Sequence, residues 1–335
     1  MTRVAVVGAG SWGTALAALL AKKGHDVYLW AFEGYVAEEV RSLGENRTYL
    51  PGVKLPPNLC CGSELEVALS EAAVVLSVSP SHFVGKVMAD ASDHIRDDAL
   101  IVSASKGIET STLRRMDEVL SGVLSPGQMD RFCALSGPSF AMEVAEESPT
   151  AVVVASRSAE AALQIQELFQ TGHFRVYTGS DVVGVELAGA LKNVIAVGAG
   201  VTAGLGFGHN TLAALVTRGL AEIRRLGVAM GAQASTFAGL AGMGDLVLTC
   251  TGSLSRNRTV GYRLGQGESL DSILGDMTAV AEGVKTAQAV HDLAERNGVE
   301  MPIAEEVYGI LVKGAEPRQA LQNLMERDPK PEEWS

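Results

Sequence analysis

The chain has few cysteines, and none of them is spaced to bind a metal ion. Its 335 residues include only four, Cys60, Cys61, Cys133 and Cys250, with no C-x-x-C pair. Cys60 and Cys61 are adjacent, which disfavours a mutual disulfide, and Cys133 lies in an apolar run typical of a small core residue. His209 has no Cys, Asp or second His at metal-ligand spacing. We therefore expect reduced thiols, no metal centre and a cytoplasmic location.

Positive charge is also scarce. Lys and Arg number 27 against 39 Asp and Glu, which gives a net charge of −12. This excess of acid argues against non-specific binding to nucleic acid or to anionic lipid. The most apolar stretch, Val182 to Gly204, contains Glu186, Lys192 and several glycines, so we expect no membrane-spanning helix. A chain of this length and ordinary composition predicts about two globular domains.

Two common motifs of enzyme active sites are missing, whereas a glycine-rich nucleotide-binding motif is complete. The sequence has no G-x-S-x-G elbow, and no Walker lysine follows its first glycine-rich loop, Gly8-Ala9-Gly10-Ser11-Trp12-Gly13. That loop follows an apolar run at Val4–Val7 and precedes good helix formers from Thr14 to Gly24. In this context Gly8 allows a tight turn, Gly10 lets the backbone approach a pyrophosphate, and Gly13 lets the helix pack on the strand. The helix N-terminus adds N–H groups and positive dipole, so the segment predicts a dinucleotide site.

The two halves of the chain differ in their hydrophobic pattern. Residues 1–180 alternate apolar runs with helical segments, which predicts an α/β domain with a doubly wound parallel sheet of Rossmann type. Residues 181–325 show helical periodicity alone, which predicts an all-helical second domain, and residues 326–335 form a charged tail that we expect to be loosely ordered. The predicted strands are Val4–Val7, Asp26–Trp30, Ala73–Val78, Ala99–Ser103, Phe132–Leu135, Thr150–Ala155 and Phe174–Tyr177, and Asn46–Asn58 is expected to be a loop.

Polar loops follow four of the predicted strands. They are Gly8–Gly13, Ser77–Ser81, Ser103–Gly107 and Ser136–Ala141. Because ligands of open α/β sheets gather beyond the carboxyl ends of the strands, we expect these loops to form one binding rim.

Lys192 is the strongest catalytic candidate. Its helical neighbours Ala188, Gly189, Ala196 and Ala199 are small, so they leave room for a ligand and offer the lysine little hydration. Desolvation or a nearby cation lowers the pKa of a lysine, which suits proton transfer near neutral pH. The alternative is a solvated helix lysine.

Asp245 lies among glycines in Gly242-Met243-Gly244-Asp245-Leu246, an otherwise apolar stretch. A carboxylate there needs a cationic partner, for which Lys192 is a candidate. The alternative is a turn aspartate that caps a local backbone N–H.

A second group of candidates suits a phosphate. Ser255 is expected to cap the helix that follows it, where Arg256 and Asn257 would bring donors to the helix N-terminus. The alternative is a solvated basic turn. Lys106 is a further cation on the predicted rim, and Ser139 is expected to be a helix N-cap first and a substrate contact second.

Six segments in this order resemble the NAD(P)-dependent glycerol-3-phosphate dehydrogenase family. They are Gly8–Ala15, Ser105-Lys106-Gly107, Ser136–Ala141, Leu191-Lys192-Asn193, Gly242–Leu246 and Ser255-Arg256-Asn257. The resemblance covers Val4 to about Leu324 and implies reversible reduction of dihydroxyacetone phosphate to sn-glycerol 3-phosphate for glycerophospholipid synthesis. His209 and Leu212 depart from the pattern, because an acidic and a basic residue are usual there in bacterial relatives.

The resemblance also implies roles for individual residues. Lys192 matches the proton donor and acceptor. The positions that match substrate contacts are Lys106, Gly137, Ser139, Lys192, Asp245, Ser255, Arg256 and Asn257. The positions that match the cofactor site, beside Gly8, Gly10 and Gly13, are Ser11, Trp12, Phe32, Tyr49, Lys106, Ala141, Arg256, Val280 and Glu282.

The choice between NAD(H) and NADP(H) stays open. Glu33 lies 20 positions after Gly13, where an acid that holds the ribose 2′-OH of NAD is expected. No arginine occupies that position, although Arg41 and Arg47 could reach a 2′-phosphate from the following loop.

Two rival functions fit the same two-domain plan. One is a reductase that acts on a 3-hydroxy acid, a 2-keto acid or 6-phosphogluconate. The second is a catalytically silent dinucleotide sensor. For the function that the resemblance implies, we expect a small-molecule substrate and a homodimer.

Overall fold

The computed structural model describes residues 1–277 and 280–332. Internal contacts divide the chain into a sheet unit, residues 1–106 and 114–185, and a helical unit, residues 107–113 and 186–335. The domain boundaries inferred from the sequence stay predictions. Of the predicted tail 326–335, residues 333–335 lie outside the described residues, and Arg327 and Lys330 in the described part form exposed ion pairs with Glu300.

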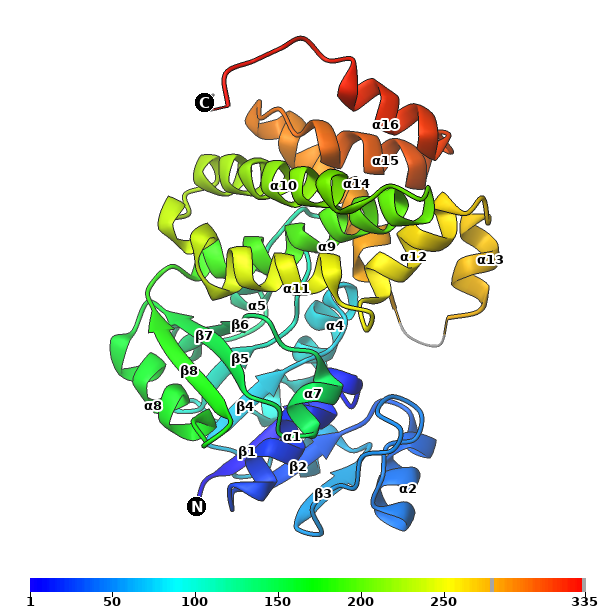
Figure 1. The fold of residues 1–335 in the computed structure, drawn as a ribbon. Coiled ribbons are helices and arrows are strands. Elements are labelled where there is room, and N and C mark those ends of the chain that lie inside the picture. Colours follow the sequence, from blue (N-terminus) through cyan, green and yellow to red (C-terminus); the bar gives the residue numbers. More distant parts are fainter. Residues whose placement is uncertain (278–279, 333–335) are drawn as a thin grey trace. The chain divides into compact units, whose positions relative to one another are not determined.

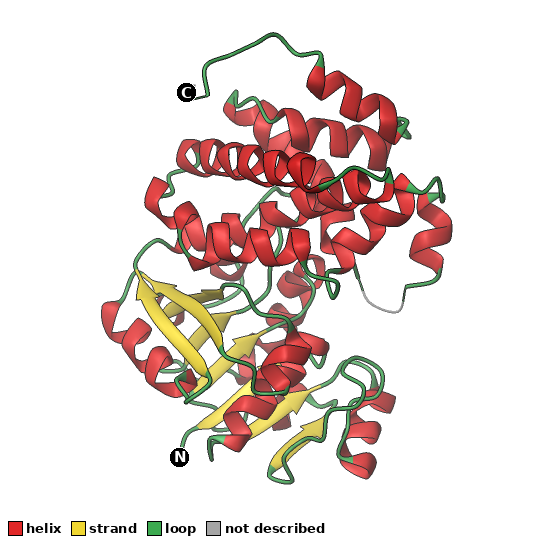
Figure 2. Cartoon of the chain, viewed as in Figure 1, coloured by secondary structure: helices red, strands yellow, loops and turns green. Residues whose placement is uncertain are grey.

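The sheet unit is built on an eight-stranded sheet, as counted over the described residues (Figures 1 and 2). Its strands are β1 (Arg3–Val7), β2 (Asp26–Trp30), β3 (Leu59–Gly62), β4 (Val74–Ser77), β5 (Leu100–Ser103), β6 (Phe132–Ser136), β7 (Thr150–Ser156) and β8 (Phe174–Gly179). The order β3-β2-β1-β4-β5-β6-β7-β8 begins with the arrangement of dinucleotide-binding sheets, in which successive strands are added on one side of β1 as far as β3 and on its other side from β4 onward. The predicted Rossmann-type fold and its seven strands are therefore confirmed.

Two features of the sheet differ from the prediction. The sequence pattern does not predict strand β3, and β7 pairs antiparallel with β6, so the sheet is mostly rather than wholly parallel. Strand β3 contains no β-branched or aromatic residue, and strand direction is not encoded in an apolar run.

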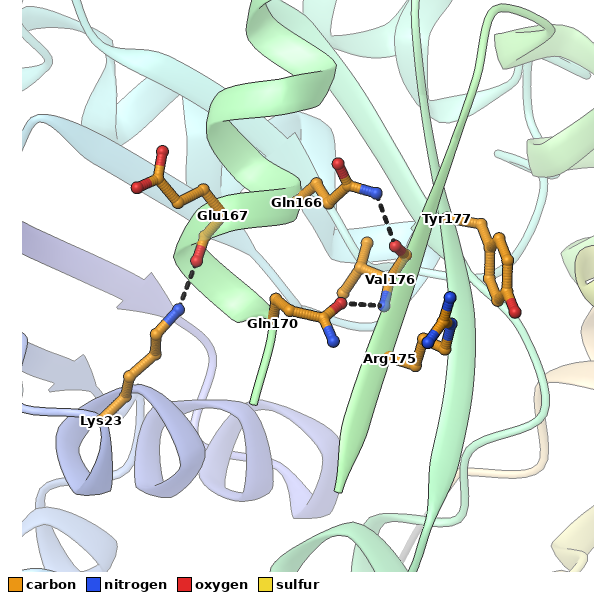
Figure 3. Close-up of a pocket in the computed structure, with 7 residues that line it drawn as sticks. All are labelled: Lys23, Gln166, Glu167, Gln170, Arg175, Val176 and Tyr177. Carbon is orange, nitrogen blue, oxygen red and sulfur yellow. Dashed lines mark hydrogen bonds between the residues drawn. The ribbon is translucent and has the colours of Figure 1, made fainter. Parts of the chain in front are cut away.

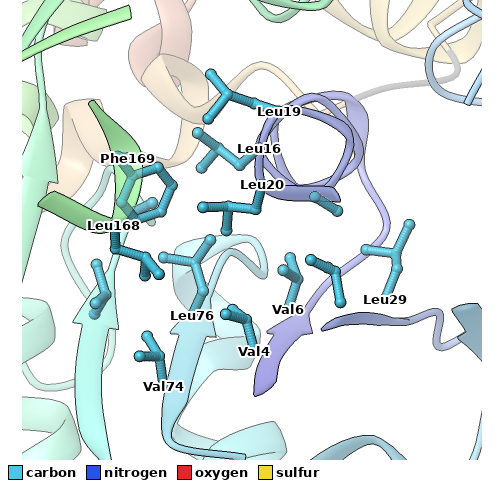
Figure 4. Close-up of a cluster of buried hydrophobic side chains, with 14 of the residues drawn as sticks. Val4, Val6, Leu16, Leu19, Leu20, Leu29, Val74, Leu76, Leu168 and Phe169 are labelled. Atoms are coloured by element: carbon cyan, nitrogen blue, oxygen red, sulfur yellow. The ribbon is translucent and has the colours of Figure 1, made fainter. Parts of the chain in front are cut away.

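The core of the sheet unit lies under helices α1 (Ser11–Lys22) and α8 (Ala159–Phe169). Figure 4 shows Leu20 of α1 pointing toward Leu76 of β4, with Phe169 beside them. All three side chains are fully buried, and the burial of each one stabilises the fold by about 2 kcal/mol of transfer free energy. This packing fixes the start of α1 at the carboxyl end of β1. The remaining helices of the unit are α2 (Gly34–Leu43), α3 (Leu65–Leu69), α4 (Ser81–Ala91), η1 (Ser92–His94), α5 (Met116–Ser121), α6 (Pro126–Met129) and α7 (Ala141–Ala145).

From residue 186 to the end of the described residues, the helical unit has helices and no strand, as predicted. They are α9 (Val182–Gly204), which begins in the sheet unit, α10 (His209–Ala229), η2 (Ala234–Ala238), η3 (Leu240–Gly244), α11 (Asp245–Thr251), α12 (Arg256–Gly265), α13 (Leu270–Gly275), α14 (Glu282–Asn297), α15 (Pro302–Lys313) and α16 (Pro317–Met325). By length and mean hydropathy, 1.6 in its most apolar window, α9 could cross a membrane, but 94% of that window is buried within the protein. A helix in the core of a globular unit is both apolar and buried in this way.

One buried carboxylate caps a helix of this unit. Glu222 of α10 is 3% exposed and accepts the N–H groups of Ile303 (2.9 Å) and Ala304 (3.2 Å) in the first turn of α15. Burial raises the pKa of Glu222 to about 7, although these bonds and the charges of Arg225 and Arg327 act in the opposite direction.

Candidate active site

The glycine-rich loop has the geometry that its sequence predicts. Gly8 has a φ of +126°, and a side chain there would meet the backbone of Val78 at 2.9 Å. A Cβ on Gly13 would lie 1.9 Å from the carbonyl oxygen of Gly8, so only glycine lets α1 pack this closely on β1. A Cβ on Gly10 would meet nothing within 4 Å. The backbone at Gly10 is therefore open to an approaching ligand, and Gly10 is the N-cap of α1.

The loops after the neighbouring strands lie at the same edge of the sheet, because β1, β4, β5 and β6 are adjacent and parallel. Hydrogen bonds connect them. The hydroxyl of Ser79 donates to Val7 O at 3.3 Å, and that of Ser105 donates to Ser79 O at 2.6 Å. The predicted single rim is therefore confirmed for these loops.

Three residues that the resemblance implies as substrate contacts meet on this rim at Gly137. The ammonium of Lys106 donates to Gly137 O at 3.1 Å, and the hydroxyl of Ser139 donates to the same oxygen at 2.9 Å. The prediction that Ser139 caps a helix is wrong. Helix α7 begins at Ala141 with Phe140 as its N-cap, because the chain stays extended beyond Pro138.

In the helical unit, Lys192 and Asp245 form a buried ion pair. The Nζ of Lys192 lies 2.8 Å from Asp245 Oδ1, and the residues are 6% and 1% exposed. The predicted partnership is confirmed, and the alternative of a solvated lysine is wrong. A buried charge in such a pair is held in one place, since moving it away from its partner costs several kcal/mol.

Thr249 is a third member of this cluster, and sequence reasoning missed it. Its hydroxyl donates to the backbone oxygen of Asp245 at 2.6 Å and accepts from Lys192 Nζ at 2.7 Å. Asp245 and Thr249 lie one turn apart on α11 and therefore on one face of it. The i, i+4 spacing of Asp245 and Thr249 was the only feature of the sequence that could have indicated this role of Thr249.

Close helix packing positions the second group of candidates. A Cβ on Gly200 of α9 would lie 2.1 Å from Arg258 O, and one on Gly261 of α12 would lie 1.9 Å from Val197 O. The two helices therefore touch through backbone atoms. As a result Asn257 reaches Asn193, the neighbour of Lys192, and donates to its Oδ1 at 2.9 Å. Asn257 Oδ1 also accepts the N–H of Gly283 at 2.9 Å.

The N-terminus of α12 agrees with its prediction. The side chain of Ser255 accepts the N–H of Arg258 at 3.3 Å and so caps the helix. Arg256, with an exposed guanidinium, donates to Val280 O at 3.1 Å, and Glu282 begins the next helix, α14. The structure thus brings together Arg256, Val280 and Glu282, three positions that the resemblance implies for the cofactor.

The end of β2 carries the remaining candidates. The ring of Phe32 is 76% exposed and meets Trp30 edge-on, with centroids 6.2 Å apart. Glu33 is half-buried and accepts the hydroxyl of Tyr49 at 3.0 Å. Trp12, on the first turn of α1, has a buried Nε1 without a hydrogen-bond partner among the residues that the structure describes. An unsatisfied donor beside the glycine loop suits a ligand there.

A hollow of about 480 Å³ lies elsewhere in the sheet unit (Figure 3). It is lined by Lys23, Gln166, Glu167, Gln170, Arg175, Val176 and Tyr177, none of which is a predicted site residue. The side-chain amides of Gln166 and Gln170 bind the backbone of Val176 at 2.7 and 2.9 Å. These amides already bind the protein's own backbone, so the loops of the rim are a better candidate for a ligand site than this hollow. Within 1–277 and 280–332, no group of three or more His, Cys, Asp or Glu side chains could hold a metal ion.

Comparison with known proteins gives matches over nearly the whole chain. Residues 3–162 match the family model of the NAD-dependent glycerol-3-phosphate dehydrogenase N-terminus, and residues 181–322 match that of the C-terminus. The chain is 58% identical over 330 residues to glycerol-3-phosphate dehydrogenase [NAD(P)+] of Geobacter metallireducens, covering 98% of both chains. It is 57% identical to the protein of the same name from Geobacter sulfurreducens, covering 99% of both.

Solved structures agree with these matches. The fold is similar to that of glycerol-3-phosphate dehydrogenase from Coxiella burnetii, with a TM-score of 0.92, 38% identity, and coverage of 97% of this chain and 98% of that one. A ketopantoate reductase from Ralstonia eutropha is 15% identical with a TM-score of 0.59, covering 95% of this chain and 99% of that one. That similarity shows a shared fold alone, so it lends no support to a 2-keto acid as substrate.

Proposed function

This chain belongs to the NAD-dependent glycerol-3-phosphate dehydrogenase family, and from this premise we propose how its residues carry out the reaction. It is an oxidoreductase that reduces dihydroxyacetone phosphate to sn-glycerol 3-phosphate with NAD(P)H, reversibly. The product supplies glycerophospholipid synthesis. The observation that carries this conclusion is the match of both family models, which together cover residues 3–162 and 181–322.

The residues of the sheet unit fit a dinucleotide. Gly10 offers open backbone, the N-terminus of α1 offers N–H donors, and Trp12 Nε1 is a buried donor that no described residue satisfies. Bound there, the reduced nicotinamide supplies the hydride that the ketone carbon receives. Gly8, Gly13 and Ser11 hold the loop in position, since the Ser11 hydroxyl donates to Tyr49 O.

We assign proton transfer to Lys192. As hydride reaches the carbonyl carbon, the oxygen becomes an alkoxide and needs a proton, which an ammonium can donate. Asp245 and Thr249 bind the Nζ of Lys192 in a nearly water-free environment, so they orient the group and hold its charge. In the reverse direction the neutral amine accepts the proton from the alcohol.

The phosphate of the substrate is assigned to the N-terminus of α12. Arg256 presents an exposed guanidinium there, and the helix dipole favours an anion. Ser255 and Asn257, which are buried, carry over as phosphate contacts from the family resemblance. Lys106, Gly137 and Ser139 of the sheet unit carry over as further substrate contacts from the family resemblance, and Lys106 adds positive potential.

We also propose a cytoplasmic location and a homodimer. Cys60, Cys61, Cys133 and Cys250 are all free thiols, which suits a reducing compartment. Light scattering of the purified protein at several concentrations tests the dimer.

Steady-state assays test the function. Purified protein is mixed with dihydroxyacetone phosphate and either NADH or NADPH, and nicotinamide absorbance is followed. We expect turnover with this ketone and none with 2-keto acids, 3-hydroxy acids or 6-phosphogluconate. Absence of turnover with both cofactors would remove the proposed function, and turnover also excludes a silent sensor.

A further inference from the structure

Helices α9 and α12 of the helical unit touch through backbone atoms on successive turns. A Cβ on Gly200 of α9 would lie 2.1 Å from Arg258 O. Four residues further along α9, a Cβ on Gly204 would lie 2.1 Å from Tyr262 O. Helix axes usually lie about 8–10 Å apart, a distance set by the side chains between them, so glycines at the contact bring two helices closer. Backbone atoms cannot rotate away from an added Cβ as a flexible side chain could, so this approach is fixed.

Helix α12 contributes a matching pair of glycines. A Cβ on Gly261 would lie 1.9 Å from Val197 O, and one on Gly265 would lie 2.5 Å from Val201 O. Each helix therefore has two glycines four residues apart on the face that meets the other helix. An alanine at any of these positions would force the helices apart, because ordinary van der Waals contacts of a Cβ begin at 3.4 Å.

The same two helices carry the groups to which we assign the proton and the phosphate. Lys192 lies on α9 about two turns before Gly200, and Arg256 is the first residue of α12. The residues that follow them, Asn193 and Asn257, are buried and joined by a hydrogen bond of 2.9 Å between their side chains. The backbone contact therefore sets the distance between the ammonium and the helix N-terminus that is assigned to the phosphate.

From this arrangement we propose that the glycine contact between α9 and α12 makes the enzyme select ketone phosphates by their length. In dihydroxyacetone phosphate one carbon separates the ketone from the phosphate ester oxygen. A substrate with one more carbon there cannot place its ketone oxygen at Lys192 and its phosphate at α12 unless the helices separate. The inference rests on the proposed function, since it uses the roles assigned there to Lys192 and to α12. The glycines are positioning residues, because they act through these groups.

A comparison of two substrates tests the proposal. We would measure kcat/KM with dihydroxyacetone phosphate and with erythrulose 4-phosphate, which has one more carbon between its ketone and its phosphate. The wild type should prefer dihydroxyacetone phosphate by roughly 10- to 200-fold, the usual discrimination of one carbon. In Gly200→Ala the new Cβ and Arg258 O must separate by about 1 Å, so kcat/KM for dihydroxyacetone phosphate should fall roughly 10- to 100-fold. The preference should fall about 5-fold or more, because the wider spacing suits the longer substrate.

Gly265→Ala is a milder variant, and it decides the case if Gly200→Ala does not fold. Its Cβ would meet Val201 O at 2.5 Å, at the end of α12 away from Arg256, so the preference should fall less, by about 3-fold. Gly309→Ala, inside α15, is the matched control, because a Cβ there would come no closer than 3.7 Å to Ala315. It should leave the preference within about 2-fold of that of the wild type. Melting temperatures are recorded for every variant.

The outcomes separate this inference from the proposed function. If Gly200→Ala and Gly265→Ala lost kcat/KM equally for both substrates, the glycines would have a purely structural role and the inference would be overturned. Equal kcat/KM values of the wild type for the two substrates would overturn it as well. Both results leave the reduction of dihydroxyacetone phosphate standing. Absence of that reduction in the wild type would instead overturn the proposed function, and this inference with it.

Discussion

Replacing Thr249 with valine should slow the enzyme although Thr249 binds neither substrate nor cofactor in this account. Valine has the same branched shape, so packing on α11 is kept. The change removes the oxygen that accepts from Lys192 Nζ at 2.7 Å, at a residue only 5% exposed, where water cannot easily substitute. A hydrogen bond to a charged group contributes about 1.5–3 kcal/mol, which corresponds to roughly 10- to 150-fold in rate if it orients the ammonium in the transition state.

A matched control lies two residues away. The hydroxyl of Thr251 donates to Val247 O at 2.8 Å, the same i−4 bond that Thr249 makes, but Thr251 is exposed rather than buried beside Lys192. Thr251→Val should therefore leave kcat within about 2-fold, because exposed substitutions away from the site have small effects.

The assay is steady-state turnover of dihydroxyacetone phosphate by both variants, with melting temperatures recorded alongside. For Thr249→Val we expect kcat to fall while KM changes by less than about 3-fold, since the lost bond acts on Lys192 rather than on the bound ketone. Equal kcat values in Thr249→Val and Thr251→Val would refute the idea that Thr249 positions the lysine.

Three further predictions concern the cofactor loop, pH and the phosphate. Gly10→Ala should keep the melting temperature, because its Cβ would meet no protein atom within 4 Å, but it should weaken NAD+ binding in calorimetry. Gly13→Ala should lower the melting temperature, because its Cβ would lie 1.9 Å from the backbone oxygen of Gly8. Folding raises the pKa of Glu222 from 4.5 to about 7, so its contribution favours the folded state at low pH and is lost as pH rises through 7. Between pH 5 and pH 8, the free energy of unfolding of the wild type, measured with urea, should therefore fall by up to about 3 kcal/mol more than that of Glu222→Gln. Parallel curves of unfolding free energy against pH for the two proteins would contradict this. Arg256→Ala should raise KM for dihydroxyacetone phosphate by about 10-fold or more with little change in kcat, because phosphate binding is mostly uniform along the reaction, and an unchanged KM would remove Arg256 from the phosphate site.

Much of the fold could be predicted because the strongest signals are local. The apolar run before Gly8 and the helix after Gly13 define β1 and α1 on their own, and the structure places both there. Strand β3 was missed because Leu59-Cys60-Cys61-Gly62 contains no β-branched or aromatic residue and follows a Pro-rich loop, whereas β4 and β5, also four residues long, contain valine or isoleucine. The antiparallel direction of β7 was missed because hydrophobic runs show burial but not direction.

The site was predictable where chemistry requires a rare residue. A lysine and an aspartate in apolar surroundings need each other, so the pair of Lys192 and Asp245 followed from the sequence. Thr249 did not, because a threonine is common in helices and only the three-dimensional contact reveals its role. Ser139 was misassigned as a cap because a serine just before an apolar run, here Phe140-Ala141-Met142, is a helix-start signal, whereas its hydroxyl binds Gly137 O in the structure.

The most direct test of the central claim is the turnover of Lys192→Ala. Its kcat should fall by about 100- to 10,000-fold, the usual contribution of a general acid, while NAD+ still binds with a dissociation constant within about 3-fold of that of the wild type. A kcat close to that of the wild type would show that another group supplies the proton and would contradict the account.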